Sequence, residues 1–276
     1  MARRIRLDAE LVRRGLARSR QHATELIDSG AVTVNGVAAT KPATQVDPAQ
    51  PVHVHHDPAR TEFASRGGHK LAGALDALAE AAPTVRGARA LDAGASTGGF
   101  TDVLLRRGAA QVIAVDVGYG QLAWPLRNDA RVIVMDRTNV RTIDATVIDP
   151  PVDLVVADLS FISLTLVLPA LAAVTAPAGS LLLMVKPQFE VGKERVGAKG
   201  VVRDPALHIE AVQKVVQAAA QQHLDLQAAT ASPLPGPSGN IEYFIHLANK
   251  PGPADIDELI RAAVARGPAG ERVEAP

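Results

Sequence analysis

The stretch Ala88-Arg-Ala-Leu-Asp-Ala-Gly-Ala-Ser-Thr-Gly-Gly-Phe100 decides which fold class the chain can adopt. An apolar run ends at Asp92, a turn of small residues follows, and an amphipathic segment begins at Phe100, which predicts a strand, a tight turn and a helix. Glycines in such a turn let the backbone approach a ligand, and the helix start offers free N–H groups to an anionic group. The Gly-x-Gly-x-x-Gly dinucleotide fingerprint does not fit, because Ser96 stands at its second glycine position. An ordinary strand-to-helix turn without a ligand remains the alternative.

Further apolar strands with a charged residue at the carboxyl end follow this stretch. In doubly wound sheets, ligands bind where the parallel strands end, so the repetition favours a binding site at that edge. A single aspartate there could equally cap a helix or stabilise a turn. We therefore predict an α/β fold with a Rossmann-like sheet of seven mostly parallel strands. The charged strand ends lie in the segments Gln111–Asp116, Arg131–Asp136, Val152–Asp158 and Gly179–Lys186.

The first 55 residues read as a separate, basic α+β unit. Ser19 can cap a second helix, Gly30 can end it, and Val32-Thr-Val-Asn-Gly-Val37 predicts a hairpin. Residues 1–20 contain seven arginines and two acidic residues. Two helices and a hairpin with arginines on one face are typical of a compact RNA-binding unit. A solvated basic helix pair is the alternative, and the hairpin makes it less favourable.

Composition excludes several classes of protein. Hydrophobic residues make up 47% of the chain, which is enough for a packed core, and the 29 basic residues balance the 29 acidic ones. The absence of cysteine excludes disulfides, thiolate metal sites and a cysteine nucleophile. The uncharged segment Leu159–Val185 is interrupted by Pro169 and Pro177, so we expect a buried helix (Leu164–Val174) and a strand rather than a membrane span. With no signal peptide visible, we expect a cytoplasmic protein.

The N-terminal pattern resembles the αL module of ribosomal protein S4. The residues that carry this resemblance are Arg6-Leu-Asp8, Ser19-Arg20, Gly30, Val32-x-Val34-Asn35-Gly36 and Lys41-Pro42.

The remainder of the chain resembles a family of RNA-modifying enzymes. An acidic strand end followed by Gly-x-Ser-x-Gly-Gly looks like the S-adenosylmethionine loop of class I methyltransferases. Behind an αL module, over about residues 5–250, the chain is identified as a member of the TlyA-type (haemolysin A-like) rRNA 2′-O-methyltransferases, which have an FtsJ-like domain. The contexts that match are Ser65-Arg-Gly-Gly-His-Lys70, Ala157-Asp-Leu-Ser-Phe-Ile162, Val185-Lys-Pro-Gln-Phe-Glu190 and Gly239-Asn-Ile-Glu-Tyr243.

The resemblance implies S-adenosylmethionine as cofactor and ribosomal RNA of one or both subunits as partner, with a cytidine ribose as target. It implies a catalytic tetrad of Lys70, Asp158, Lys186 and Glu242. We expect the protein to be a monomer and to hold no metal. The residues expected to bind the cofactor are Asp92, Gly94, Ala95, Ser96, Thr97, Gly98, Gly99, Phe100, Asp116, Asp136 and Asp158. The residues expected to bind RNA are Arg4, Arg6, Arg14, Arg18, Arg20, Lys41, Arg66, Lys193, Arg195 and Lys199.

The chemistry explains why such residues are needed. A ribose 2′-hydroxyl is a very weak acid and must lose its proton as its oxygen attacks the methyl group. We expect Lys186 to be the general base, Lys70 to tune it electrostatically, Asp158 to orient Lys186, and Glu242 to position Lys70 or the ribose hydroxyls. A lysine accepts a proton only as the neutral amine, which a second lysine and partial burial favour. Lys70 is expected in the first turn of its helix.

The expected organisation is an RNA-binding domain at 5–58, a linker at 59–64, a methyltransferase domain at 65–250 and a terminal helix with a tail at 251–276. Three other functions remain open. A ribosome-binding or assembly factor with little activity is disfavoured by the complete tetrad, and a membrane-active haemolysin by the lack of a spanning segment. A base methyltransferase is disfavoured because Asp158-Leu-Ser-Phe161 lacks the prolines of the Asn/Asp-Pro-Pro-Tyr/Phe motif.

Overall fold

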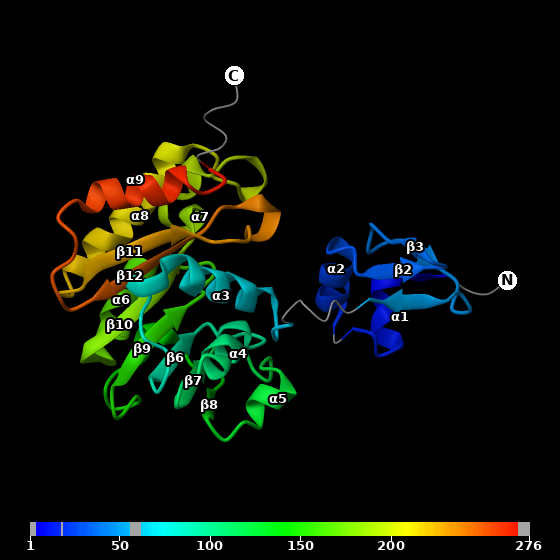
Figure 1. The fold of residues 1–276 in the computed structure, drawn as a ribbon, viewed down its shortest axis with the longest axis horizontal. Helices are drawn as coiled ribbons and strands as arrows, with labels where there is room; N and C mark the ends of the chain where they lie inside the picture. The colour runs from blue at the N-terminus through cyan, green and yellow to red at the C-terminus, as the bar shows by residue number, and fades with distance from the viewer. Residues whose placement is uncertain (1–3, 18, 56–61, 270–276) are drawn as a thin grey trace. The chain divides into compact units, whose positions relative to one another are not determined.

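The chain divides into two compact units, Met1–Glu62 and Phe63–Pro276 (Figure 1). The computed structural model describes residues 4–17, 19–55 and 62–269. The boundary falls inside the segment expected to be a linker. Its last residues already belong to the second unit, because the Ala64 N–H donates to Asp102 Oδ2 at 2.8 Å.

The first unit packs two helices against short antiparallel strands. One sheet has the order β3-β2-β5, and β1 pairs with β4. The predicted hairpin is confirmed, since Val34 pairs with Val37 and the turn residues Asn35 and Gly36 both have positive φ. The core contains Leu7, Leu11, Ala23, Ile27 and Val32. The elements are β1 (Ile5–Arg6), α1 (Leu7–Arg13), α2 (Arg20–Asp28), β2 (Val32–Val34), β3 (Val37–Ala38), β4 (Gln45–Val46) and β5 (Val52–Val54).

Helix α2 has the caps that its sequence predicts. Ser19 Oγ accepts from the His22 N–H at 3.1 Å, which satisfies one of the free donors at the helix start. At the other end Gly30 has φ +74°, and the Ala31 N–H donates to the Leu26 carbonyl at 3.0 Å. This is a Schellman closure, for which glycine is the preferred residue.

The second unit is built on a seven-stranded sheet with the order β11-β12-β10-β9-β6-β7-β8. The strands β10, β9, β6, β7 and β8 run parallel, and β12 is antiparallel to both its neighbours. The predicted Rossmann-like sheet of seven mostly parallel strands is therefore confirmed. The strands are β6 (Arg89–Ala93), β7 (Gln111–Val115), β8 (Val132–Met135), β9 (Val152–Ala157), β10 (Thr175–Val185), β11 (Asp225–Ala231) and β12 (Tyr243–Ala248).

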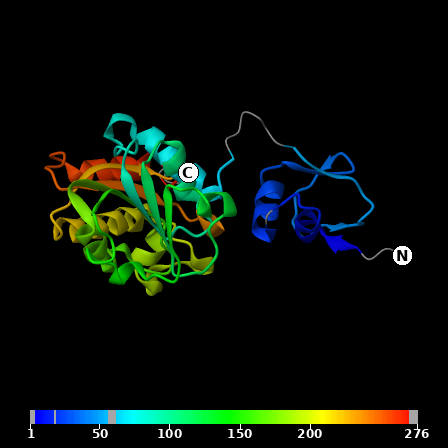
Figure 2. The same ribbon diagram turned by 90° about the horizontal axis from the view of Figure 1, so that it is seen from below.

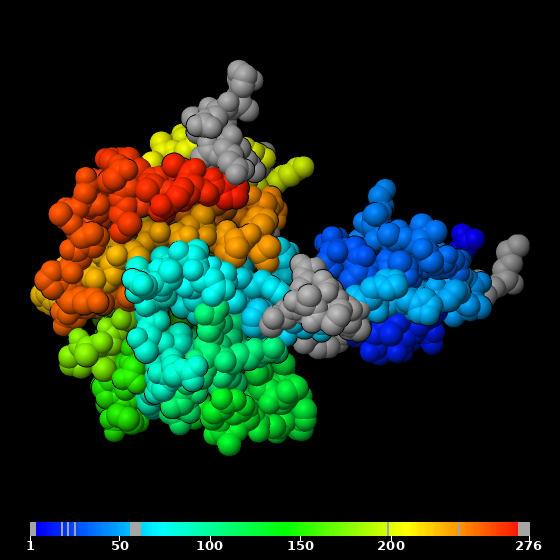
Figure 3. Space-filling model, viewed as in Figure 1, coloured from blue at the N-terminus to red at the C-terminus, as the bar shows by residue number. Residues whose placement is uncertain are grey.

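Helices cover both faces of this sheet, as Figures 1 and 2 show. One apolar layer joins α3, α4 and α5 to the sheet, and a second layer joins α6, α8 and α9 to the opposite face. In the space-filling view, α9 (red) lies over the orange segment that carries β11 (Figure 3). The helices are α3 (Arg66–Leu78), α4 (Gly99–Arg106), α5 (Trp124–Arg127), α6 (Leu168–Ala173), α7 (Pro187–Glu190), α8 (Pro205–Ala220) and α9 (Ile256–Ala265). Short 3₁₀ turns lie at Ala79–Ala81, Val140–Thr142, Leu164–Leu166, Lys193–Arg195, Ala198–Gly200 and Pro237–Gly239.

The chain reverses its direction across the sheet at β6. It passes from β6 to β7 and β8 on one side, and returns through β9 and β10 on the other. The carboxyl ends of β6 and β9 therefore flank the switch point, where α/β sheets bind their ligands. Gly94 makes this crevice possible, because its φ is +84° and a Cβ there would lie 2.6 Å from the Asp158 carbonyl oxygen.

Two local expectations are wrong. The helix expected over Leu164–Val174 is a 3₁₀ turn followed by α6, which starts afresh around Pro169 because proline has no N–H to continue the preceding turn. Lys70 lies in the second turn of α3 rather than the first, because the helix already begins at Arg66. Across residues 4–17, 19–55 and 62–269, none of the helices combines the length and the apolar character needed to cross a membrane.

Candidate active site

Two lysine–carboxylate pairs lie at the carboxyl edge of the sheet. Lys70 on α3 places its Nζ 2.5 Å from Oε2 of Glu242, which directly precedes β12. Lys186, directly after β10, places its Nζ 2.5 Å from Oδ1 of Asp158, which directly follows β9. Both lysines are only 7% exposed and Glu242 is fully buried. The four residues that the sequence predicts as a catalytic tetrad thus form two close ion pairs.

The strand register brings these two pairs to the same edge. Strand β10 pairs with β12 in antiparallel register, with Val185 opposite Tyr243. Lys186 and Glu242 therefore extend neighbouring strands at the same end. Strand β9 runs parallel to β10 with Ala157 beside Leu183, so Asp158 leaves the sheet on the other side of Lys186. Four elements that are far apart in sequence thus supply one constellation.

Glu242 keeps one carboxylate oxygen unused. Its Oε1 is buried and has no hydrogen-bond partner in the described part of the chain. The oxygen lies so close to Gly236 that a Cβ on that residue would overlap it. A buried acceptor without a donor is unfavourable, so the fold accepts a cost at this position.

Ser160 and Phe161 belong to the same site, although the sequence analysis did not single them out. Lys186 Nζ donates to Ser160 Oγ at 3.1 Å, which gives the amine a second fixed partner. Phe161 is 92% exposed and has φ +64°, a conformation that is unfavourable for a bulky residue. Its ring lies 5.4 Å from that of Phe189. Both residues lie inside the Asp-Leu-Ser-Phe motif, but their exposure and backbone conformation cannot be seen in a sequence.

The loop after β6 has an exposed surface formed by Ser96 and Thr97. Asp116 holds the loop from the next strand, since its carboxylate accepts from the Ser96 N–H at 2.8 Å and from the Gly118 N–H at 2.7 Å. Gly98 then starts α4 from a left-handed conformation with φ +94°. The N–H groups of Gly94, Ala95, Ser96 and Gly98 donate within the protein, so the loop faces a ligand mainly through the exposed residues Ser96 and Thr97.

Other predicted cofactor residues are engaged within the protein. Gly99 permits α4 to approach α3, because a Cβ there would overlap Ser65 Oγ and lie 2.7 Å from the Gly68 nitrogen. Phe100 is buried, with its ring 6.0 Å from that of Phe244. If Gly99 and Phe100 contribute to cofactor binding, they do so indirectly, by fixing the shape of the loop. Ala95 is likewise buried in the core.

Asp136, expected to accept from an adenine amino group, is already paired. Its Oδ2 accepts from Arg127 Nη2 at 2.9 Å and from the Gly120 N–H at 3.2 Å. The hydrogen bond from Arg127 is the main reason why the pKa of Asp136 lies below its usual value. The carboxylate stays ionised and orders the segment between β7 and β8.

The predicted RNA-binding residues differ in their exposure and in the contacts that they make within the protein. Arg4, Lys41, Lys193 and Lys199 are exposed. Arg195 pairs with Glu210 at 2.6 Å, and Arg66 Nη2 donates to the Pro235 carbonyl at 3.4 Å. Arg18 lies outside the described residues. Three of the predicted residues, Arg6, Arg14 and Arg20, form ion pairs with the buried acids Asp8 and Glu10.

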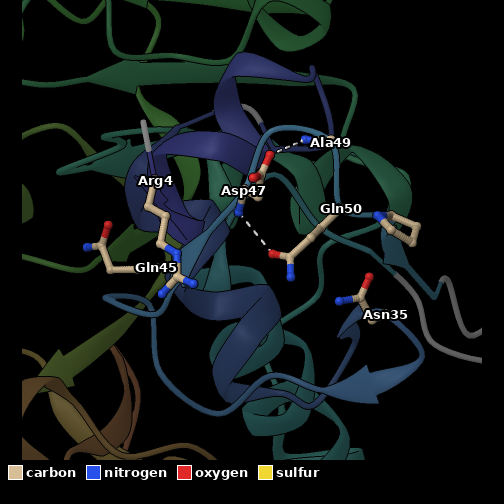
Figure 4. Close-up of a pocket in the computed structure, with 7 residues that line it drawn as sticks. Arg4, Asn35, Gln45, Asp47, Ala49 and Gln50 are labelled. Atoms are coloured by element: carbon tan, nitrogen blue, oxygen red, sulfur yellow. Dashed lines mark hydrogen bonds between the residues drawn. The ribbon is translucent and has the colours of Figure 1, made fainter. Parts of the chain in front are cut away.

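Arg4 lines a polar pocket on the first unit (Figure 4). The hollow is bordered by the side-chain amides of three residues and by the turn between β4 and β5. Asp47 shapes that turn, since its Oδ1 accepts from the Ala49 N–H and its N–H donates to Gln50 Oε1, both at 2.9 Å. The lining residues are Arg4, Asn35, Gln45, Asp47, Ala49, Gln50 and Pro51.

Asn240 is a further residue that the sequence analysis missed. Its Oδ1 accepts from the Val202 N–H at 3.2 Å, and its Nδ2 donates to the Gly200 carbonyl at 2.9 Å. These bonds fasten the end of the charged loop at 188–203 to the segment that leads into Glu242. The charged loop is therefore hydrogen-bonded to the segment that contains Glu242.

Asp92 is a fully buried acid beneath the loop. Thr101 Oγ1 donates to its Oδ2 at 2.6 Å, and its Oδ1 has no partner within the described residues. Burial raises the pKa of Asp92 to about 7, with the nearby Asp158 and Asp116 acting in the same direction. The proton thus leaves this carboxyl group near neutral pH.

Replacing Asp92 with Asn is expected to change how stability depends on pH. A raised acid pKa means that between about pH 4 and about pH 7 only the folded state keeps the proton. The stability contributed by that proton is complete below pH 4 and lost by pH 7. Urea unfolding at pH 5 and pH 8 should show Asp92→Asn gaining stability relative to wild type as the pH rises. An equal difference at both pH values would contradict the assignment.

Comparison with known proteins agrees with this geometry. The chain is 54% identical over 272 residues to the 16S/23S rRNA (cytidine-2'-O)-methyltransferase TlyA of Mycobacterium tuberculosis, covering 97% of this chain and 100% of that protein. It is 42% identical over 247 residues to the putative rRNA methyltransferase YqxC of Bacillus subtilis, covering 89% and 86%. The solved structure of a putative hemolysin from Streptococcus thermophilus aligns with a TM-score of 0.76 at 35% identity, covering 99% of this chain and 98% of the other.

Two families match separate parts of the chain. The S4 domain matches residues 5–52, and the FtsJ-like methyltransferase matches residues 63–249. These ranges fall within the two structural units. The chain therefore belongs to the FtsJ-like methyltransferase family, enzymes that use S-adenosylmethionine, and carries an S4 domain before the catalytic unit.

Proposed function

We propose that this enzyme transfers the methyl group of S-adenosylmethionine to the 2′-oxygen of a cytidine ribose in ribosomal RNA. The observation that carries the proposal is the pair of buried lysine–carboxylate contacts at the carboxyl edge of the sheet. The relative from Mycobacterium tuberculosis, named for methylation of cytidine in both 16S and 23S rRNA, supports the substrate class and both subunits as targets. On this proposal the enzyme is a monomer and works in the cytoplasm, where ribosomal subunits are available.

The loop at 94–98 fits the cofactor expected for the family. The exposed residues Ser96 and Thr97, beside the carboxylate of Asp116, offer hydroxyl groups to a polar ligand. S-adenosylmethionine would supply an activated methyl group on a sulfonium centre. The residues proposed to hold it are Asp92, Gly94, Ala95, Ser96, Thr97, Gly98, Gly99, Phe100, Asp116, Asp136 and Asp158.

Lys186 is the proposed general base. Asp158 and Ser160 fix its Nζ from two directions, at 2.5 and 3.1 Å. Because the Lys186 side chain is already held in place, it loses little conformational entropy when a ribose hydroxyl binds beside it. The amine must reach the hydroxyl in its neutral form, accept the 2′-proton, and release it to solvent after the oxygen has bonded to the methyl group.

Lys70 and Glu242 are proposed to set the charge and shape of the site. The Lys70 ammonium, fixed by Glu242 Oε2, is a buried cation in the same constellation. We propose that this cation acts electrostatically on Lys186 and on the charge that develops at the reacting hydroxyl. The unused Oε1 of Glu242 is proposed to accept from a ribose hydroxyl.

Phe161 is proposed to hold the target nucleotide. A chain rarely leaves a phenylalanine 92% exposed in a left-handed conformation without a ligand for it. The residue lies one position after Ser160, which contacts the proposed base. Because aromatic side chains stack on unpaired RNA bases, the ring can support the cytosine while its ribose faces Lys186.

Lys186→Ala is expected to abolish methyl transfer while leaving cofactor binding intact. General-base catalysis contributes roughly 100- to 10,000-fold to rate, so transfer should fall by about three orders of magnitude. Purified ribosomal subunits, tritiated S-adenosylmethionine and mass spectrometry of nuclease digests measure the amount and position of the label. Lys250→Ala, an exposed lysine beyond the opposite end of β12, is the matched control and should match wild type.

The outcome of this experiment separates the competing functions. Label on a ribose 2′-oxygen that disappears in Lys186→Ala supports the proposal, whereas near-normal transfer by that variant contradicts the role of Lys186. Label on a base would keep the fold and reject the 2′-hydroxyl chemistry. Subunit binding without any label would favour a ribosome-binding factor.

Phe161→Ala is expected to reduce methyl transfer only by weakening the interaction with the RNA substrate. Base–aromatic stacking contributes about 1–3 kcal/mol, so kcat/KM for ribosomal subunits should fall roughly tenfold, with unchanged affinity for the cofactor. Val147→Ala is the control, because Val147 is also exposed, at 48%, but precedes β9 at the opposite edge of the sheet. Equal kinetics for the two variants would contradict the stacking role.

A further inference from the structure

Asp8 is a buried carboxylate that holds two exposed arginines. It opens the first turn of α1 and is only 4% exposed. Arg6 donates from Nε to Oδ1 at 3.1 Å and from Nη2 to Oδ2 at 2.9 Å. Arg20, at the start of α2, donates from Nη2 to the same Oδ2 at 2.9 Å. One acid thus joins side chains from two elements of the S4 domain.

Both guanidinium groups remain available to a partner. The side chains of Arg6 and Arg20 are 46% and 61% exposed. Arg6 uses its Nε edge for Asp8 and keeps Nη1 free of that contact, and Arg20 keeps both Nε and Nη1 free of it. The donors that do not face the acid can therefore bind an anion without breaking the existing bonds.

Stability alone gives a weak reason for this arrangement. Ion pairs to half-exposed arginines contribute little to folding, and burying a carboxylate carries a desolvation penalty. Holding two long side chains in one orientation does have value for binding, because each would otherwise lose rotamer freedom when the partner arrives. The Arg6 hydrogen bond holds the pKa of Asp8 down at about 2, so the acid stays ionised throughout the working pH range.

We propose that Asp8 is a positioning residue for RNA recognition. It presents Arg6 and Arg20 as a preorganised pair that binds neighbouring phosphates of the RNA backbone, in the fork geometry that arginine uses for phosphate. This inference rests on the proposed function, because it assumes that the S4 domain meets ribosomal RNA. The inference gives an acidic residue a role in RNA binding, on a surface where only the basic residues would be expected to bind a polyanion.

The neighbouring acid Glu10 shows the contrast. It is fully buried and pairs with Arg13 at 2.6 Å and Arg14 at 2.7 Å. Arg14 is only 21% exposed and donates to the Pro48 carbonyl at 2.8 Å, in the turn that lines the polar pocket. Glu10 therefore holds one exposed arginine (Arg13, 55%) and one that binds the domain itself (Arg14), whereas both partners of Asp8 are exposed.

Asp8→Asn gives a test in which the sign of the effect is decisive. The variant gains one unit of positive charge. If Asp8 only reduced the positive charge of this surface, the variant would therefore bind RNA more tightly than wild type. The positioning role predicts binding weakened about 5- to 20-fold, because two arginines lose their fixed orientation. The affinity of the full chain for purified 30S and 50S subunits, at one fixed salt concentration, measures this.

Asp28→Asn is the matched control for charge. Asp28 is exposed at the end of α2, and its replacement makes the same change in net charge without touching Arg6 or Arg20. Its affinity should stay within about twofold of wild type or increase slightly. Asp8→Glu keeps the negative charge and displaces the carboxylate, so it should weaken binding as Asp8→Asn does. This second variant decides the matter if Asp8→Asn fails to fold in a thermal melt.

The inference and the proposed function fail in different ways. Asp8→Asn or Asp8→Glu binding as tightly as wild type, with a native melting temperature, would overturn the positioning role. Absence of wild-type binding to either subunit would also overturn it. If wild type binds subunits but transfers no methyl group, the proposed function fails while the arginine pair remains supported. A positioning role further predicts a raised KM for subunits with kcat unchanged.

Discussion

The close approach between Gly94 and the Asp158 carbonyl is the constraint on which the catalytic unit depends. Only a residue without a Cβ fits there, and its positive φ turns the chain out of β6 at the switch point of the sheet. The same contact sets the cofactor loop beside the end of β9, from which Asp158 extends. The loop proposed to bind the cofactor and the acid that pairs with the proposed base are therefore placed next to each other by one backbone contact.

The two ion pairs at this edge are better explained by chemistry than by stability. A buried lysine–carboxylate pair seldom stabilises a protein more than apolar residues of similar size would. Here Lys70 and Lys186 each lie 2.5 Å from an acid, and one acid oxygen of Glu242 has no partner in the described chain. An arrangement that buries two lysines with acids and leaves an acceptor unsatisfied is costly to fold, which favours a functional reason for it. The proposed role of Asp8 in the S4 domain is related, since a buried acid there contacts two exposed arginines.

The sequence predicted the sheet well because periodicity and strand ends carry local information. The repeated charged residue after an apolar run located Asp158 and Lys186, and the Asn35-Gly36 turn located the first hairpin. Contacts between distant segments were not readable in the same way. Nothing local indicates that Gly99 serves helix packing, that Asp136 is paired with Arg127, or that Ser160 touches Lys186. Those features depend on which side chains the tertiary fold brings together.

The central claim is that the Lys70–Glu242 and Lys186–Asp158 pairs serve one methyl transfer, in which Lys70 acts through its charge. Single-turnover methyl transfer by wild type, Lys70→Arg and Lys70→Gln tests it most directly. Arginine keeps a positive charge beside Glu242 and glutamine removes it, so the rate should fall more for Lys70→Gln than for Lys70→Arg, with unchanged affinity for the cofactor. Equal losses in the two variants, both with a native melting temperature, would show that Lys70 acts only on structure, and would contradict the account.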